Sequence, residues 1–92
     1  AYTVKCGCSS SMVAIHEACK SLLQYDSDVA LAGGVNIKSR YQYGYLYEKG
    51  SILSADGRCC PFSDDASGTV FANGLGFVLL KRLDDAIEDG DT

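Results

Sequence analysis

The sequence has little proline and histidine, with one residue of each, and its eight basic residues are scattered rather than clustered. A proline-poor chain that is 47% apolar and has ten glycines is not a linker or a disordered tail. That composition is typical of a folded globular domain. The net charge is −4, and no basic patch interleaved with aromatic residues is present. Nucleic-acid binding is therefore not expected.

Long hydrophobic runs are also missing. No apolar stretch approaches the roughly 20 residues that a membrane-spanning helix needs, and the first residues lack the basic-then-apolar pattern of a signal peptide. We expect no membrane association and a cytoplasmic location. The chain begins inside an apolar run and stops in a turn-like segment. We therefore expect residues 1–92 to be a piece of one larger domain, truncated at both ends.

Cysteines are present in an odd number, at Cys6, Cys8, Cys19, Cys59 and Cys60. No disulfide framework can be inferred from the C-x-C and C-C spacings, and the paired C-x2-C halves of a zinc site are missing. We expect reduced thiols, as in a cytosolic enzyme, and no bound metal.

The hydrophobic pattern predicts an α/β order with too few strands to close a core. The expected elements are a strand end at 1–5, a buried helix at 12–25, a strand at 29–36, a mostly irregular segment at 38–74 with a short helix at 42–49, a strand at 76–82 and a short helix at 84–88. Only a narrow polar stripe interrupts the apolar surface of the helix at 12–25, so we expect that helix to be largely buried. Gly33 and Gly34 would weaken their strand unless a backbone or a ligand approaches closely there.

Cys8 is the candidate reactive residue. It follows Gly7 and precedes three serines, at the point where the expected strand turns into the apolar helix. A helix N-terminus carries about half a positive charge and free N–H groups, which favour thiolate over thiol and can hold a developing oxyanion. A cysteine beside glycine and serine is also a common small buried residue. The residues alone leave both interpretations open.

The motif around Cys8 resembles a known signature. Residues 4–16, VKCGCSSSMVAIH, are similar to the active-site signature of β-ketoacyl synthases, usually V-D-T-A-C-S-S-S-L-V-A-[VI]-H. The resemblance continues in register through residues 28–36, 50–59 and 74–83, so it covers nearly the whole chain. The segments at 44–47 and 68–71 look more like modular type I polyketide synthases than like fatty-acid enzymes.

The resemblance implies a specific chemistry. Cys8 would accept an acyl chain from the phosphopantetheine arm of an acyl carrier protein, and decarboxylated malonyl-carrier would then attack the thioester. The backbone N–H of Cys8 would form part of the oxyanion hole. No cofactor would be bound directly, because phosphopantetheine belongs to the carrier protein. Two histidines that complete the family's site are absent from this chain, so the segment alone should be inactive as an acyltransferase.

His16, the single histidine, is interpreted as structural. It lies on the expected helix, two turns along from Cys8. Eight residues at the helical rise separate the two backbones by about 12 Å, whereas a general base must come within about 3 Å of its proton. Departures from the family's usual residues also matter. The signature's usual aspartate is Lys5 and its usual threonine is Cys6, and Ser63 stands where an aspartate commonly follows phenylalanine.

By resemblance the fold is thiolase-like and only partial, with sheet order 3-2-1-4-5 in each half and the last strand antiparallel. Residues 1–5 would be strand 3, 29–36 strand 4 and 76–82 strand 5, and strands 1 and 2 would be missing between them. Strand 3 pairs across a two-fold axis in the family, so residues 1–5 would help form a homodimer. The alternatives are a non-elongating or decarboxylase-type homologue and a non-enzymatic cysteine-rich module.

Overall fold

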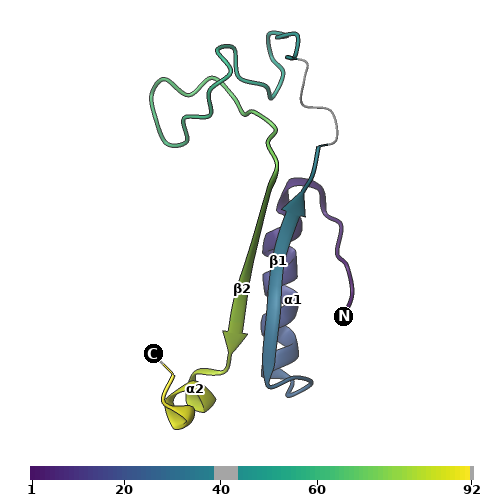
Figure 1. Cartoon of the computed structure of the whole chain (residues 1–92), viewed down its shortest axis with the longest axis vertical. Coiled ribbons are helices and arrows are strands. Elements are labelled where there is room, and N and C mark those ends of the chain that lie inside the picture. The colour runs from purple at the N-terminus through teal and green to yellow at the C-terminus, as the bar shows by residue number, and fades with distance from the viewer. Residues whose placement is uncertain (39–43, 92) are drawn as a thin grey trace. The chain divides into compact units, whose positions relative to one another are not determined.

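The computed structural model describes residues 1–38 and 44–91. The chain forms two compact units, one built from residues 1–35 together with residues from 75 onward, the other from the segment between them. The regular elements are a short 3-10 helix η1 (Gly7–Ser9), helix α1 (Ser10–Leu23), strands β1 (Val29–Asn36) and β2 (Gly74–Lys81), and helix α2 (Leu83–Asp89) (Figure 1). The strands predicted at 29–36 and 76–82 and the helices predicted at 12–25 and 84–88 are therefore confirmed, with boundaries that differ by at most two residues.

A left-handed residue, Tyr25, at φ 59°, follows the C-cap residue of helix α1. The Tyr25 N–H donates to the Leu22 carbonyl at 3.2 Å and the Asp26 N–H to the Ser21 carbonyl at 2.9 Å. These two bonds satisfy carbonyls that the last turn of a helix leaves free, in the pattern usually built around glycine. Tyrosine at this position is strained, so other contacts must hold it.

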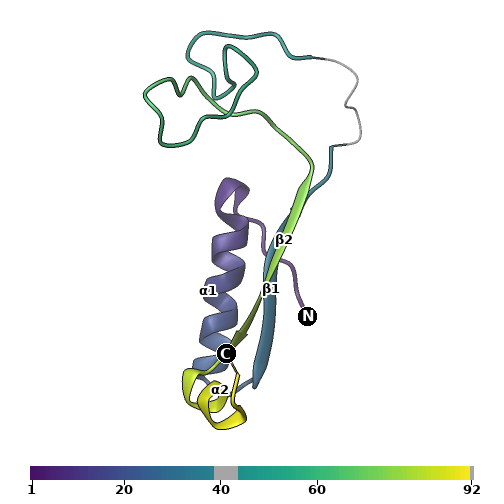
Figure 2. The ribbon, with the colours of Figure 1, turned by 60° about the vertical axis from the view of Figure 1, so that its left-hand side comes forward.

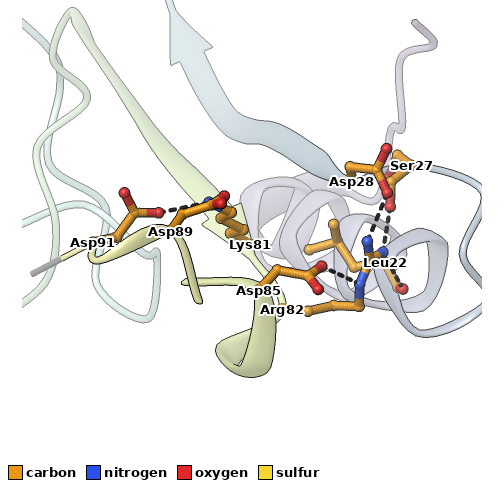
Figure 3. A network of polar contacts seen from close by, with 8 residues as sticks. All are labelled: Leu22, Ser27, Asp28, Lys81, Arg82, Asp85, Asp89 and Asp91. Atoms are coloured by element: carbon orange, nitrogen blue, oxygen red, sulfur yellow. Dashed lines mark hydrogen bonds and ion pairs between the residues drawn. The ribbon is translucent and has the colours of Figure 1, made fainter. Parts of the chain in front are cut away.

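The guanidinium of Arg82 provides those contacts. It lies over the Tyr25 ring, 4.5 Å from the ring centroid. Its Nη1 donates to the carbonyls of Leu22 at 3.0 Å and Ser27 at 2.7 Å, and its Nη2 pairs with Asp28 at 2.6 Å (Figure 3). The Arg82 side chain is only 13% exposed. One cation thus caps the C-terminal end of α1 and ties it to the start of β1.

The same arginine begins helix α2. Arg82 is the N-cap residue of α2, and its Nε pairs with Asp85 in the first turn at 2.6 Å. Lys81, the last residue of β2, pairs with Asp89 and with Asp91 just beyond the helix. Two consecutive cations at the end of β2 therefore bind the neighbouring helices. Arg82 binds α1 and α2, and Lys81 binds α2, as Figure 3 shows.

Strands β1 and β2 are hydrogen-bonded neighbours and run in opposite directions (Figure 1). Helix α1 lies along one face of this pair (Figure 2). On β1, Ala32 is buried, whereas Leu31 is 69% and Val35 61% exposed. A nearly continuous apolar run is typical of a strand that is covered on both faces, but over the described residues α1 alone covers this sheet.

The helix itself is also less buried than its composition predicted. Leu22 is the one buried residue of α1, while Met12 is 68% and Leu23 74% exposed. The polar stripe is confirmed in part by the pair of Glu17 with Lys20, whose charged atoms lie 3.2 Å apart. An apolar helix needs neighbours on several sides to be buried. In the described residues α1 has a sheet on one side only.

Close approach at Gly33 and Gly34 was predicted and is confirmed. A Cβ added to Gly33 would lie 2.1 Å from the Gly76 carbonyl oxygen and 2.7 Å from the Phe77 Cα, distances at which the backbone would have to move. A Cβ on Gly34 would lie 3.2 Å from the Cβ of Ser11 in α1. The glycine pair lets β2 approach at one residue and α1 at the next.

Residues 1–5 were predicted to end a strand, and they form none. Within the described residues the sheet contains β1 and β2 alone, so the backbone of residues 1–5 has no strand to pair with. A cavity of about 640 Å³ lies between residues 1–4, one side of α1 and β1. Its lining is mostly apolar and includes Val4, Ala14, Ala18 and Leu31.

The unit between the strands, described over residues 36–38 and 44–74, is irregular, as predicted. Leu53 and Thr69 form an isolated parallel bridge, and the buried residue Ser54 lies beside it. The prediction of a helix at 42–49 is wrong for residues 44–49, which are not helical. Residues 42 and 43 lie outside the described part of the chain. This stretch ends in a turn. Gly50 has φ +88°, and the Ser51 N–H donates to the backbone carbonyl of Glu48.

The exposed apolar surface predicts that residues 1–92 alone do not fold cooperatively. Of the described apolar side chains only Leu22 and Ala32 are buried, and Leu75 and Leu79 are more than 70% exposed. A two-stranded sheet is at best marginally stable in water. We expect thermal unfolding of the isolated segment, followed by circular dichroism, to be broad or preceded by aggregation. A sharp, reversible transition of a monomeric sample would contradict this.

Gly33→Ala is expected to destabilise the fold by about 3 kcal/mol or more, because the new methyl group would overlap the backbone of β2. Gly76→Ala is the matched control, since a Cβ there meets nothing within 4 Å. The measurement is the urea midpoint of each variant in a complete domain that contains this segment. Equal midpoints for the two variants would show that the close approach at Gly33 is not needed.

Candidate functional site

Cys8 lies in the middle of η1, directly before α1, and is exposed. The helix start predicted at this place is confirmed, whereas the strand predicted to lead into it is not formed. Gly7, which precedes Cys8, has φ +58°. This is the left-handed region that glycine enters without steric cost. The chain thus turns sharply at Gly7 and presents Cys8 at the start of the helical segment.

The backbone hydrogen bonds of this turn leave the Cys8 N–H available. The Ser9 N–H donates to the Cys6 carbonyl at 3.3 Å, and the Ser10 N–H donates to the Gly7 carbonyl. Cys8 precedes both donors, in the position where the first N–H groups of a helical segment have no internal acceptor. Free N–H groups and the positive end of α1 favour an anion at this place.

The serine hydroxyls act within the turn and do not cap α1. Serine is a favoured N-cap residue, and Ser9 is the N-cap residue of α1, but it makes no side-chain capping bond. Its Oγ donates instead to the Cys6 carbonyl at 2.9 Å. Ser10 accepts the Cys6 N–H at 2.9 Å and donates to the Gly7 carbonyl at 2.8 Å. The residues on either side of Cys8 are therefore tied together.

Other chemistry-bearing residues do not gather around Cys8. The cavity beside α1 is lined by Ser10 and Glu17 but not by Cys8. His16 is exposed on α1, and eight residues of helical chain correspond to about 12 Å. The described residues contain no group of histidine, cysteine, aspartate and glutamate side chains that could hold a metal ion. All five cysteines are free. Over the described part of the chain, no helix is both long and apolar enough to cross a membrane.

A polar cluster is centred on Ser54, which is fully buried, and no pattern in the sequence predicts it. The Ser54 hydroxyl donates to Asp56 at 2.6 Å, lies 3.1 Å from the Ser67 hydroxyl and accepts the Arg58 N–H at 3.1 Å. The Ser54 carbonyl accepts the Tyr45 hydroxyl at 2.6 Å. Residues 54–57, Ser-Ala-Asp-Gly, have the composition of a turn, but nothing in the sequence indicates that Ser67 and Tyr45 converge on them.

The cluster stabilises the ionised form of Asp56. The hydrogen bond from the Ser54 hydroxyl, followed by that from the Arg58 N–H, holds the pKa of Asp56 below its ordinary value. Both donors satisfy the carboxylate inside its own turn, so we assign the cluster to holding the loop and not to chemistry.

Comparison with known proteins gives a consistent result. Residues 1–86 match the family described as beta-ketoacyl synthase, N-terminal domain. The chain is 50% identical over 88 residues to a phenolphthiocerol/phthiocerol polyketide synthase protein of Mycobacterium tuberculosis, and the match covers 96% of this chain and 6% of that protein. It is 51% identical over 89 residues to non-reducing polyketide synthase aoiG of Aspergillus oryzae, covering 97% of this chain and 4% of that protein.

Solved structures agree with the sequence relatives. Ketosynthase twelve from the bacillaene polyketide synthase of Bacillus amyloliquefaciens matches with a TM-score of 0.87 at 35% identity, over 99% of this chain and 16% of that chain. A ketosynthase domain for oxazolomycin from Streptomyces albus matches with a TM-score of 0.71 at 43% identity, over 92% of this chain and 15% of that one. The chain thus spans about a sixth of the ketosynthase structures that it matches.

The Ser54 cluster predicts a pH-dependent contribution of Asp56 to stability. Because the folded-state pKa of Asp56 is lowered, its ionised form stabilises the fold at pH values above the ordinary carboxyl pKa of about 4. This contribution is lost as the pH falls through the folded value. Asp56→Asn should therefore destabilise a complete domain at pH 7, by an amount that shrinks toward zero in acid.

The measurement is the urea midpoint of Asp56→Asn between neutral pH and about pH 3, the range in which aspartate titrates. Asp64→Asn is the control, since the Asp64 carboxylate forms no hydrogen bond or ion pair with the described residues. A penalty for Asp56→Asn that does not vary with pH would contradict the assignment.

Proposed function

The chain belongs to the β-ketoacyl synthase family, and we propose that it supplies the nucleophile-bearing part of the condensing domain of a polyketide synthase. One observation carries the proposal. Cys8, the signature cysteine, lies in a glycine turn directly before α1, exposed and with its N–H outside the turn's own hydrogen bonds. The relatives that match are polyketide synthases and ketosynthase domains. This supports chain elongation as the reaction of the parent protein.

In the first proposed step, the Cys8 thiolate attacks the carbonyl carbon of an acyl thioester on the phosphopantetheine arm of an acyl carrier protein. The electron pair of the carbonyl moves onto oxygen, where the Cys8 N–H can donate to it. Collapse of this intermediate breaks the bond to the carrier sulfur, and the carrier leaves as a thiolate that takes up a proton from water. The acyl group is then held on Cys8 as a thioester.

In the second proposed step, malonyl-carrier loses carbon dioxide, and the resulting carbanion attacks the Cys8 thioester. The new carbon–carbon bond forms as the bond to the Cys8 sulfur breaks, which regenerates the thiolate and leaves a β-ketoacyl chain on the carrier. By resemblance, two histidines outside this chain assist decarboxylation. Phosphopantetheine enters with the carrier protein, so no cofactor is bound by the domain itself. The segment alone is not expected to condense substrates.

The finer architecture belongs to the same proposal. We place residues 1–5, β1 and β2 at strands 3, 4 and 5 of a thiolase-like half. The adjacency of β1 and β2 supports this placement, as does the mostly apolar cavity between residues 1–4 and β1. In this arrangement the missing strands 1 and 2 would occupy that cavity, and residues 1–5 would pair with a second copy in a homodimer.

The sequence departures favour one alternative. Lys5, Cys6 and Ser63 replace residues that are usual in the family's motifs, and a non-elongating or decarboxylase-type homologue would keep the same fold. The downstream histidines separate the two, because elongation requires both the acyl thioester on Cys8 and the decarboxylation that they assist.

Cys8→Ala is expected to abolish covalent acylation, with a loss of at least about a thousandfold, as is typical when a catalytic nucleophile is removed. The test uses a complete domain: either the parent domain, or the bacillaene ketosynthase with this segment in place of its own. Incubation with an acyl-N-acetylcysteamine thioester and intact-protein mass spectrometry give the rate. Cys19→Ala is the control, since Cys19 is a half-buried cysteine within α1.

The proposal requires the acyl adduct to form in Cys19→Ala and to be absent from Cys8→Ala. An adduct of undiminished rate in Cys8→Ala would exclude Cys8 as the nucleophile. Iodoacetamide gives a second readout, because an activated Cys8 should be alkylated far faster than Cys19, Cys59 or Cys60. Equal alkylation of these thiols would also contradict the proposal.

A further inference from the structure

We propose that Ser10 is the positioning residue of the nucleophile turn, defined here as residues 6–10, and that its hydroxyl sets the acylation rate at Cys8. The inference rests on the proposed function of Cys8 and extends it to a residue that forms no bond to substrate. The two hydrogen bonds of one hydroxyl carry it: Ser10 Oγ accepts the Cys6 N–H at 2.9 Å and donates to the Gly7 carbonyl at 2.8 Å.

These two bonds join Ser10, which follows Cys8, to the two residues before Cys8. A serine hydroxyl has one hydrogen to donate and lone pairs to accept, so it can join a backbone N–H and a backbone C=O at the same time. Here the N–H belongs to Cys6 and the C=O to Gly7, the two residues that precede the nucleophile. Ser10 itself belongs to the first turn of α1. Its hydroxyl therefore couples the orientation of the nucleophile turn to the helix.

The turn needs such a constraint because of Gly7. A Cβ placed on Gly7 meets nothing within 4 Å, so crowding does not impose the left-handed φ of +58°. Glycine populates positive and negative φ about equally. What holds this conformation must therefore be the hydrogen bonds of the turn. Loss of the Ser10 hydroxyl would let Gly7 adopt other conformations, and the Sγ and N–H of Cys8 would move with it.

The neighbouring serines do not provide the same constraint. The Ser9 hydroxyl donates to the Cys6 carbonyl, which already accepts the Ser9 N–H, so it repeats an existing link. The Ser10 hydroxyl also bonds a carbonyl that its own N–H already reaches, that of Gly7, but in addition it makes a link of a new kind by accepting the Cys6 N–H. The Ser11 hydroxyl forms no side-chain hydrogen bond with the described residues. Ser11 packs its Cβ near Gly34, and an alanine there keeps that atom. Ser11→Ala is therefore the matched control for Ser10→Ala.

The test measures acylation of a complete domain by an acyl-N-acetylcysteamine thioester at several concentrations. This separates the maximal rate constant from the half-saturating concentration. For Ser10→Ala we expect the maximal rate constant to fall about tenfold, equivalent to about 1.4 kcal/mol, and the half-saturating concentration to stay unchanged. A purely structural role would lower the amount of folded protein but not this rate constant per folded molecule. Ser11→Ala should match the unmodified domain in both quantities.

Threonine and valine at position 10 give a second, isosteric comparison, which holds even if Ser10→Ala does not fold. Ser10→Thr keeps the hydroxyl and should restore the rate, whereas Ser10→Val has the same shape without the hydroxyl and should remain slow. Equal rates for Thr and Val, or for Ser10→Ala and Ser11→Ala, would overturn the inference while leaving Cys8 as the nucleophile. Acylation that persists in Cys8→Ala would instead overturn the proposed function itself.

Discussion

The contact at Gly33 and Gly34 fixes the distances between the elements that carry the site. At Gly33 the backbone of β2 comes so close that a single added carbon would overlap the Gly76 carbonyl. At Gly34 the Cβ of Ser11 approaches from α1. Since Ser11 follows the nucleophile by three residues, this contact sets where the N-terminal end of α1 lies against the sheet. Gly33 and Gly34 allow this packing because they have no side chains, which would push β2 and α1 away.

The other end of α1 is held by charge. Arg82 satisfies carbonyls that the last helical turn leaves free and pairs with Asp28 at the start of β1. A cation at a helix C-terminus opposes the partial negative charge there, and the pair with Asp28 raises the pKa of Arg82 further above its ordinary value. The helix that presents Cys8 is thus located by glycine contacts near one end and by an ion pair and hydrogen bonds at the other, although few of its apolar side chains are buried.

The sequence predicts an element correctly where the local pattern of residues permits only one kind of backbone structure. The apolar runs at 29–36 and 76–82, the turn before the apolar helix, and the paired glycines each limited the backbone to few choices, and the structure has those elements. The prediction fails where the outcome depends on partners. Residues 1–5 have the composition of a strand but no neighbouring strand, and α1 has the composition of a buried helix but a sheet on one side only. The Ser54 cluster joins residues far apart in the sequence, and no periodic pattern encodes such a convergence.

Two opposing effects bear on the residue at position 7 of the nucleophile turn: backbone strain at positive φ and conformational freedom. The family's usual signature has alanine where this chain has Gly7, and at φ +58° an alanine would be strained by roughly 1–2 kcal/mol. Glycine removes that strain, but its many accessible conformations make the turn less well defined. A hydroxyl that joins the Cys6 N–H to the Gly7 carbonyl restricts those conformations without adding atoms beside Cys8. In this chain the two residues act in sequence: glycine at position 7 relieves the strain of the left-handed turn, and the hydroxyl of Ser10 restricts the freedom that glycine brings.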